Sequence, residues 1–193
     1  MSILLPATSN AQQLKLNLIG SASRQAGPQF DNFDWGFAVG GELFFYLNRH
    51  ILLGAHVLYN KWTPDENSFT EQISSFFDSD IVGDAFSIEL LPVLRVTTRY
   101  QSAINIFLQA GAGLYIINNE ITIDANSFDA TVEETFGAGT RGRFGISLAA
   151  GLTLGDLNSL SIDLFPAFNL VFLNEGDAAW RYFTLNLGIA LNI

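Results

Sequence analysis

The chain has 193 residues, of which 49% are hydrophobic and only 15% charged, and its formal net charge is −10. This length fits one domain, and the acidic balance excludes nucleic acid as a partner, because binding phosphates requires clustered Lys and Arg. The absence of cysteine excludes disulfides and Cys-based zinc sites. No segment approaches the ~20 consecutive apolar residues of a membrane-spanning helix, so a helical membrane protein is not expected.

The N-terminal segment differs from the rest of the chain. Met1–Ala11 has too short an apolar run for a signal peptide, although Ser9, Asn10 and Ala11 have the small side chains of a cleavage site. We interpret residues 1–11 as a disordered signal remnant or artefact. Residues 12–193 are interpreted as one domain.

Strict alternation of large apolar residues with small or polar ones is the main structural signal in the chain. Successive side chains of a strand point to opposite faces, so this period of two predicts β-strands. The alternation recurs about eight times. The predicted strands, in chain order, cover Leu14 to Leu18, Phe33 to Leu47, Ile51 to Tyr59, Phe86 to Val96, Ala103 to Ile116, Phe144 to Leu154, Leu160 to Leu170 and Tyr182 to Ile193.

The connections between these strands alternate in length. Long segments cover residues 23–32, 60–84, 117–143 and 172–180, whereas residues 48–50, 98–102 and 155–159 form tight turns. Long outer loops and short periplasmic turns are typical of outer-membrane barrels. The sequence therefore predicts an all-β fold, an eight-stranded antiparallel up-and-down transmembrane β-barrel. An even strand number places both termini on the periplasmic side of a bacterial outer membrane.

The composition of the two strand faces indicates which one meets lipid. The predicted strands at residues 103–116, 144–154 and 182–193 contain no charged residue, so neither face suits water. We expect the aliphatic face to contact hydrocarbon and the smaller, more polar face to fill the narrow lumen. Phe44, Phe107 and other aromatic residues would fill the space opposite lumen glycines. An outer-rim aromatic girdle is expected from Trp35, Tyr59, Trp62 and Trp180.

Two features require adjustments to regular strands. Pro92 and Pro166 fall inside predicted strands, and each lacks the N–H that a closed ladder uses, so we expect bulges there. The predicted strand from Phe33 to Leu47 is longer than the ~9 to 11 residues needed to cross a membrane. Its upper half is expected to project above the bilayer.

The chain resembles the OmpA/OmpX-like superfamily of small outer-membrane β-barrels over nearly its whole length. The resemblance is carried by the segment from Gln109 to Tyr115 (QAGAGLY) and by the alternating C-terminal strand. These barrels typically end in an aromatic residue, whereas this chain ends in Ile193. The resemblance implies a membrane barrel, but members include membrane-stabilising barrels, adhesins, conduits and lipid A-modifying enzymes.

A recurring set of polar residues is predicted to face the lumen. The expected lumen polar network consists of Lys15, Glu42, His56, Glu89, Arg95, Gln109 and Asp163. The main interpretation is a paired, hydrogen-bonded core, because unpaired buried charge is costly. The alternative is a gate or a proton-linked pore that opens when ion-pair partners are exchanged.

Catalysis is not expected. An enzyme site needs a nucleophile, a base and an orienting group, and the only histidines are His50, in a predicted turn, and His56, facing the lumen.

The predicted outer loops are acidic, with Asp65, Glu66, Asp78, Asp80, Asp84, Glu133 and Glu134. They lack the D-x-D-x-D-G spacing of a calcium loop, so neither a metal site nor a cofactor is expected.

The leading hypothesis is a non-enzymatic outer-membrane barrel, monomeric, with a structural role and a surface-interaction role through its acidic loops. Its expected partners are outer-membrane lipid or lipopolysaccharide, and a surface protein bound by the loops. The alternatives are a small porin-like conduit for ions or hydrophobic solutes and, third, a lipid A-modifying enzyme. The long segment at residues 117–143 leaves open whether extra strands form around Ile121 to Ile123 and Thr131 to Thr135.

Overall fold

A computed structural model describes residues 14–26, 35–63, 78–98, 103–127, 130–137, 139–155, 160–173 and 179–193. The segment at residues 1–11 and the acidic residues Asp65 and Glu66 lie outside this range. The described part of the chain contains no helix that is long and apolar enough to cross a membrane. Its strands are β1 (Leu14–Ala26), β2 (Gly36–Tyr46), β3 (Ile51–Trp62), β4 (Asp78–Thr97), β5 (Ile104–Ser127), β6 (Ala130–Gly137), β7 (Arg141–Gly155), β8 (Leu160–Val171) and β9 (Trp180–Asn192).

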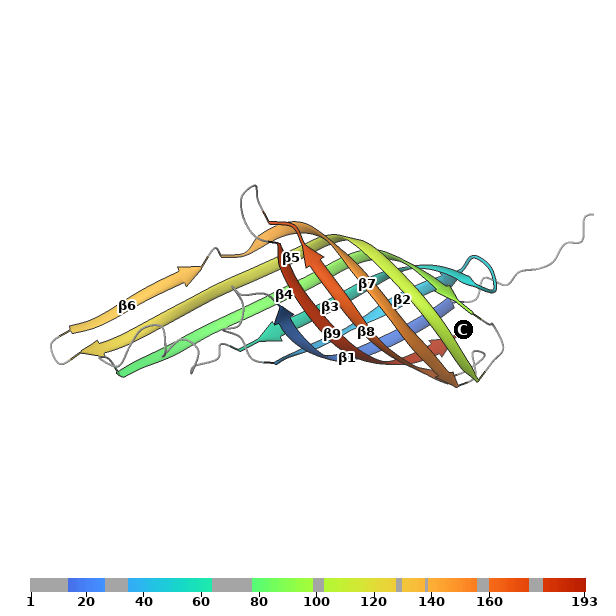
Figure 1. Cartoon of the computed structure of the whole chain (residues 1–193), viewed down its shortest axis with the longest axis horizontal. Coiled ribbons are helices and arrows are strands. Elements are labelled where there is room, and N and C mark those ends of the chain that lie inside the picture. The colour runs from blue at the N-terminus through green and yellow to red at the C-terminus, as the bar shows by residue number, and fades with distance from the viewer. Residues whose placement is uncertain are drawn as a thin grey trace, which may run out of the picture.

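These strands form one antiparallel sheet that closes on itself (Figure 1). Over the described residues the order is β4-β3-β2-β1-β9-β8-β7-β5, and a pairing of β4 with β5 completes the ring. The first strand pairs with the last, and Leu14 and Ile193 exchange backbone hydrogen bonds of 2.9 and 2.8 Å. Closure leaves no unpaired edge within the barrel, which lipid requires. The predicted eight-stranded up-and-down barrel is confirmed.

The alternating residues separate onto two faces. In β9, the side chains from Trp180 to Ala190 at even positions are buried, whereas those from Arg181 to Leu191 at odd positions are exposed. The other barrel strands show the same alternation, and Leu108 on β5 is 63% exposed on the outside. The outer face is therefore a continuous band of exposed apolar side chains. A band of this kind suits contact with lipid and not with water.

Aromatic rings fill the interior where glycine leaves space. A Cβ atom added to Gly54 would lie 2.6 Å from the ring of Phe44, and one added to Gly145 would lie 2.6 Å from the ring of Tyr115. Phe107 and Phe165 pack edge to face, with 5.5 Å between ring centroids. The expected pairing of large aromatic residues with lumen glycines is therefore observed.

Three strands extend far beyond the barrel wall (Figure 1). The pairing of β4 with β3 ends at Ala85, and the pairing of β5 with β7 ends at Ile117. β4 and β5 nevertheless stay paired with each other beyond these residues, as far as Asp78 and Asn126. β6 pairs with β5 from Glu120 to Ser127. At about 3.3 Å per residue, the ten residues of β5 beyond Ile117 add about 33 Å. We call β4 from Asp78 to Asp84, β5 from Glu120 to Ser127 and β6 the projecting sheet.

The projecting sheet corrects two expectations from the sequence. β2 has only 11 residues, from Gly36 to Tyr46, so the strand that was expected to project ends with the barrel wall and β4 and β5 project instead. The segments around Ile121 to Ile123 and Thr131 to Thr135 do form strands. The predicted acidic loop residues Asp78, Asp80, Asp84, Glu133 and Glu134 therefore belong to strands, because the pairing of β4, β5 and β6 continues without the barrel.

The expected bulges at the two prolines are absent from the described strands. Pro92 keeps its register partner Ala55 in β3, and the β4–β5 register is the same on either side of it, from Leu90 to Val93. Pro166 likewise pairs with Leu185 in β9. In an antiparallel ladder each residue directs its N–H toward one neighbour only, so a proline removes one local pairing and no residue needs to be inserted.

Candidate functional site

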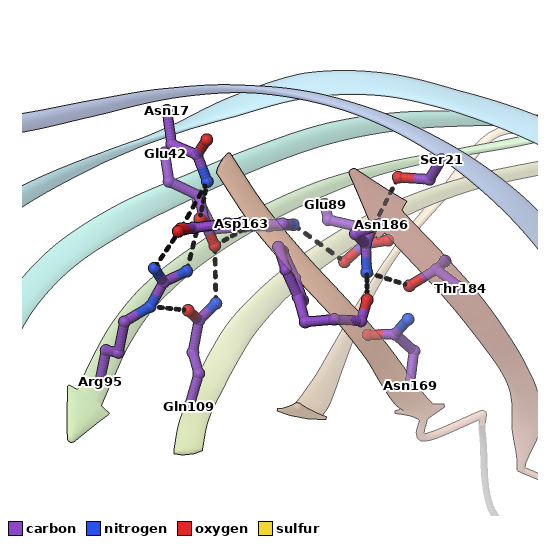
Figure 2. A network of polar contacts seen from close by, with 12 residues as sticks. Asn17, Ser21, Glu42, Glu89, Arg95, Gln109, Asp163, Asn169, Thr184 and Asn186 are labelled. Atoms are coloured by element: carbon purple, nitrogen blue, oxygen red, sulfur yellow. Dashed lines mark hydrogen bonds and ion pairs between the residues drawn. The ribbon is translucent and has the colours of Figure 1, made fainter. Parts of the chain in front are cut away.

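Arg95 lies at the centre of a polar network inside the barrel (Figure 2). Its guanidinium donates from Nε to Gln109 Oε1 at 2.8 Å, from Nη1 to Asp163 Oδ2 at 2.6 Å and from Nη2 to Glu42 Oε2 at 2.9 Å. The planar guanidinium presents several donors in a fixed geometry, which suits contacts with several acceptors at once. Arg95 is thereby bonded to β5, β8 and β2 from its position on β4.

Aromatic rings surround the same guanidinium. Its central carbon lies 4.0 Å from the ring centroid of Phe107 and 4.4 Å from that of Phe44. The electron-rich faces of these rings attract a cation, and they exclude water from the ion pairs. The arginine is held in an aromatic cage as well as in a set of hydrogen bonds, so its side chain has little freedom to move.

Asp163 is shared by a second cation. Lys15 Nζ lies 2.9 Å from Oδ1 and 2.8 Å from Oδ2 of Asp163, and Thr153 Oγ1 donates to Oδ1 at 2.7 Å. Asn17 joins Asp163 to Glu42, donating to them at 3.3 and 3.0 Å. These side chains are all buried. Every carboxylate oxygen of Asp163 is thus occupied, as a stable buried charge requires.

His56 lies between two glutamates. Its Nδ1 is 3.1 Å from Glu42 Oε1, and its Nε2 is 3.5 Å from Glu89 Oε2. A neutral imidazole carries only one N–H, so only the protonated ring satisfies both carboxylates. With Lys15 and Arg95 at +1 each and the carboxylates of Glu42, Glu89 and Asp163 at −1 each, a proton on His56 would bring the sum of these buried charges to zero.

The network crosses the whole lumen. Glu89 on β4 accepts hydrogen bonds of 2.8 Å from Asn60 on β3 and 2.7 Å from the hydroxyl of Tyr182 on β9. β9 and β4 lie on opposite sides of the ring of strands. Together with the contacts of Arg95 and Asp163, every barrel strand contributes at least one side chain. The interior is a packed polar core.

The structure brings together all seven residues that the sequence placed in the lumen, namely Lys15, Glu42, His56, Glu89, Arg95, Gln109 and Asp163. Sequence reasoning missed four members of the network, Asn17, Asn60, Thr153 and Tyr182. For Asn17 and Asn60 the signal was available, because each has the same alternation parity in its strand as a residue that was identified. Asn60, for example, is four residues from His56 on β3.

The expected aromatic girdle is wrong for two of its four residues. Trp62 is 0% and Trp180 4% exposed, and they pack edge to face inside the barrel with 5.2 Å between ring centroids. Both stand at lumen positions in their strands, and the strand period therefore outweighs the general preference of tryptophan for the interface. Trp35 is 61% exposed on the outside, and Tyr59 is partly buried on the outer face.

The remaining candidate residues form no reactive centre in the described part of the chain. His50 is exposed in the turn after β2, with Nδ1 3.1 Å from the backbone oxygen of Thr97. Both ring nitrogens of His56 face carboxylates, whereas a catalytic imidazole needs one for its nucleophile. No group of three or more His, Asp or Glu side chains that could hold a metal ion occurs among the described residues.

Solved structures of outer-membrane proteins are similar to this fold. Neisserial surface protein A is similar at a TM-score of 0.55 and 12% identity, covering 92% of this chain and 96% of that one. The attachment invasion locus protein Ail of Yersinia pestis is similar at a TM-score of 0.55 and 11% identity, covering 94% of this chain and 99% of that one. The outer membrane enzyme PagL is similar at a TM-score of 0.51 and 12% identity, covering 89% of this chain and 97% of that one.

No protein-family model and no curated protein matches the chain. At such low identities the structural likeness shows the fold and leaves the activity open, since surface proteins and an enzyme share it. The resemblance expected from the sequence is confirmed at that level: this chain has the fold of the small, OmpA/OmpX-like β-barrels of bacterial outer membranes.

Proposed function

We propose that this chain is a non-enzymatic outer-membrane barrel that supports the membrane and presents the projecting sheet to a cationic partner at the cell surface. The observation that carries the proposal is the register of that sheet. Asp80 pairs with Asp124, and Asp124 pairs with Glu133, so one row across three strands contains only carboxylates. Toward the barrel, the next register row of the same parity is the uncharged pair Val82 and Thr122, and in the row after it Asp84 pairs with Glu120.

Cross-strand partners and alternate residues share one face of a sheet. Register positions of one parity in the projecting sheet, which we call the acidic face, are therefore occupied by Asp78, Asp80, Asp84, Glu120, Asp124 and Glu133. The register positions of the other parity are occupied mainly by apolar residues, among them Ile81, Ile121, Ile123, Val132 and Phe136. Like charges that lie directly opposite each other destabilise a sheet by up to about 1 kcal/mol per pair. A cationic partner bound to the acidic face would relieve this repulsion.

The same residue ranges contain no Lys or Arg that could neutralise the acids from within the sheet. A complementary basic partner would be attracted at a distance and bound in a salt-dependent way. The barrel supports this role as a rigid base, because its interior is packed and its charges are paired. In this orientation the projecting sheet faces the outside, and Leu14 and the C-terminal Ile193, which are paired at the opposite end of the barrel, face the periplasm (Figure 1).

The packed interior also supports a non-conducting, non-enzymatic barrel over the alternatives of a conduit or a lipid A-modifying enzyme. Conduction would require several of the contacts of Arg95 and Glu89 to break at once. Catalysis at His56 would require it to leave Glu42 or Glu89.

Binding of an oligolysine peptide to the protein in lipid nanodiscs tests the proposal. The variant Asp80→Asn/Asp124→Asn/Glu133→Gln removes the carboxylate row and is expected to weaken binding at least about ten-fold at low salt. The control Asp31→Asn/Asp34→Asn/Glu175→Gln removes the same number of charges from segments outside the sheet. Equal losses in both variants would show that only net charge matters and would overturn the proposal. An epitope inserted between Ser127 and Ala130 should be stained on intact cells.

A further inference from the structure

The outward positions on the described parts of four neighbouring barrel strands are almost free of charge, and their two charges lie near one end of the barrel. On the described parts of β8, β9, β1 and β2, the outward positions are apolar or glycine except for Arg24 and Arg181. Both arginines are exposed, and both stand near the end of the barrel from which the sheet projects. In a chain with a net charge of −10, two cations on this otherwise apolar surface need a physical reason.

The register places the two arginines side by side. Arg24 on β1 pairs with Phe183 on β9, and Arg181 pairs with Ala26, two residues further along β1. They are therefore diagonal neighbours on one face, at about 7 to 8 Å between backbone positions. Like charges at this spacing repel, and no carboxylate stands among the described outward positions of these four strands to offset them.

Their height matches the boundary of the bilayer. The ten-residue rise from Leu14 to Arg24 spans about 33 Å along the strand, and a tilt of about 40° reduces it to about 25 Å along the barrel axis. This equals the usual height of the apolar band of such barrels. Trp35, which is an aromatic residue of the expected interface, lies against Arg24, with 5.7 Å from the guanidinium carbon to its ring centroid.

We propose that Arg24 and Arg181 form a binding site for the phosphate group of a membrane lipid at this rim of the barrel. A guanidinium binds phosphate oxygens through paired, charge-assisted hydrogen bonds, and two of them on adjacent strands can hold one phosphate from both sides. The apolar side chains just below, Phe183 and Phe37, would contact the acyl chains of the same lipid. The phosphate also removes the repulsion between the two cations.

The inference rests on the membrane placement in the proposed function and is independent of the acidic face. If the projecting sheet lies outside the cell, the lipid belongs to the outer leaflet, where the phosphates are those of lipid A. The residues Asp80, Asp124 and Glu133 do not take part, so their variant retains this site. Loss of oligolysine binding and loss of lipid binding are thus separate results.

The test uses detergent-solubilised protein in which Trp62→Phe and Trp180→Phe leave Trp35 as the only tryptophan. Titration with lipid A should change the Trp35 fluorescence, whereas inorganic phosphate at the same concentration should not. Arg24→Gln/Arg181→Gln should weaken lipid A binding at least ten-fold, and each single change about three-fold. Arg49→Gln, at an exposed position in the turn after β2, is the matched control and should bind as the parent does.

Two results would overturn the inference. Unchanged lipid A affinity in Arg24→Gln/Arg181→Gln would show that the arginines do not hold the lipid. An equal response to inorganic phosphate would show an anion site without lipid selectivity. A second variant is needed because Arg24→Gln/Arg181→Gln can fail to insert. Arg24→Lys/Arg181→Lys keeps both charges without the planar donors and should bind lipid A with intermediate affinity. Native mass spectrometry of the lipid A that each variant retains measures this without fluorescence.

Discussion

Replacement of Arg95 by methionine is the sharpest test of how the barrel interior is stabilised. Methionine keeps the length of the apolar stem between Phe44 and Phe107 but removes the hydrogen bonds of 2.6 Å to Asp163 and 2.9 Å to Glu42. Each charge-assisted bond contributes about 1.5 to 3 kcal/mol, and breaking a buried ion pair by removing one partner costs about 3 to 5 kcal/mol. We expect Arg95→Met to lower the free energy of unfolding by about 3 to 5 kcal/mol.

A second change identifies the cause of that loss. In Arg95→Met, Asp163 keeps Lys15, but Glu42 retains only His56 among the cations that contact it. Adding Glu42→Gln removes the under-compensated carboxylate, so the double variant should recover at least about 1 kcal/mol of the loss. Arg49→Met removes an arginine that is exposed in the turn after β2 and should change stability by less than about 0.5 kcal/mol.

Urea unfolding in lipid vesicles, followed by tryptophan fluorescence and by the gel mobility of unheated samples, measures all three variants. A loss below about 1 kcal/mol in Arg95→Met would refute the reasoning, because the network would then stabilise the barrel no more than a surface contact does. A double variant that is less stable than Arg95→Met would refute the assignment of the loss to an uncompensated carboxylate at position 42.

Three further outcomes follow from the same geometry. In single-tryptophan variants, brominated lipids should quench Trp35, which is 61% exposed, far more than Trp62 or Trp180, and strong quenching of Trp62 would place it on the lipid face after all. The wild-type protein in planar bilayers should show no steady conductance, because every barrel strand contributes to the polar core, and stable open-channel currents would favour a conduit. Gly151→Ala should destabilise the barrel by about 1 to 3 kcal/mol, since its Cβ would lie 2.6 Å from the backbone oxygen of Leu164 and 2.8 Å from Phe107. Gly20→Ala, with nothing within 4 Å of the added Cβ, is its control, and equal losses in urea unfolding would contradict the packing argument.

Some features of the candidate site could be predicted residue by residue. Glu42, Glu89 and Arg95 stand at lumen positions because alternation is a local property, and each could be assigned from its neighbours in the strand. The same rule, applied strictly, assigns Trp62 and Trp180 to the lumen. The girdle expectation failed because it used the general preference of tryptophan for interfaces in place of the strand period.

The projecting sheet could not be predicted with the same certainty. Around Asp80, Asp124 and Glu133 the alternation is interrupted by acidic and small residues, which also suit a loop. Whether such a segment forms a strand depends on whether a neighbour pairs with it, and that pairing links β4, β5 and β6 across many residues of sequence. The prolines show the same dependence, since the effect of Pro92 is set by which neighbour its missing N–H would have faced.

The sequence by itself determined the barrel class, the number of strands in the barrel wall and the lipid-facing surface, because a period of two and an uncharged aliphatic face follow from the covalent chain and from the hydrophobic effect. The tertiary structure decided which lumen side chains meet. Arg95 and Asp163 lie on β4 and β8, which are not adjacent, and their 2.6 Å contact depends on the stagger of all the strands between them. That stagger is a property of the closed ring of hydrogen bonds, and no single strand encodes it.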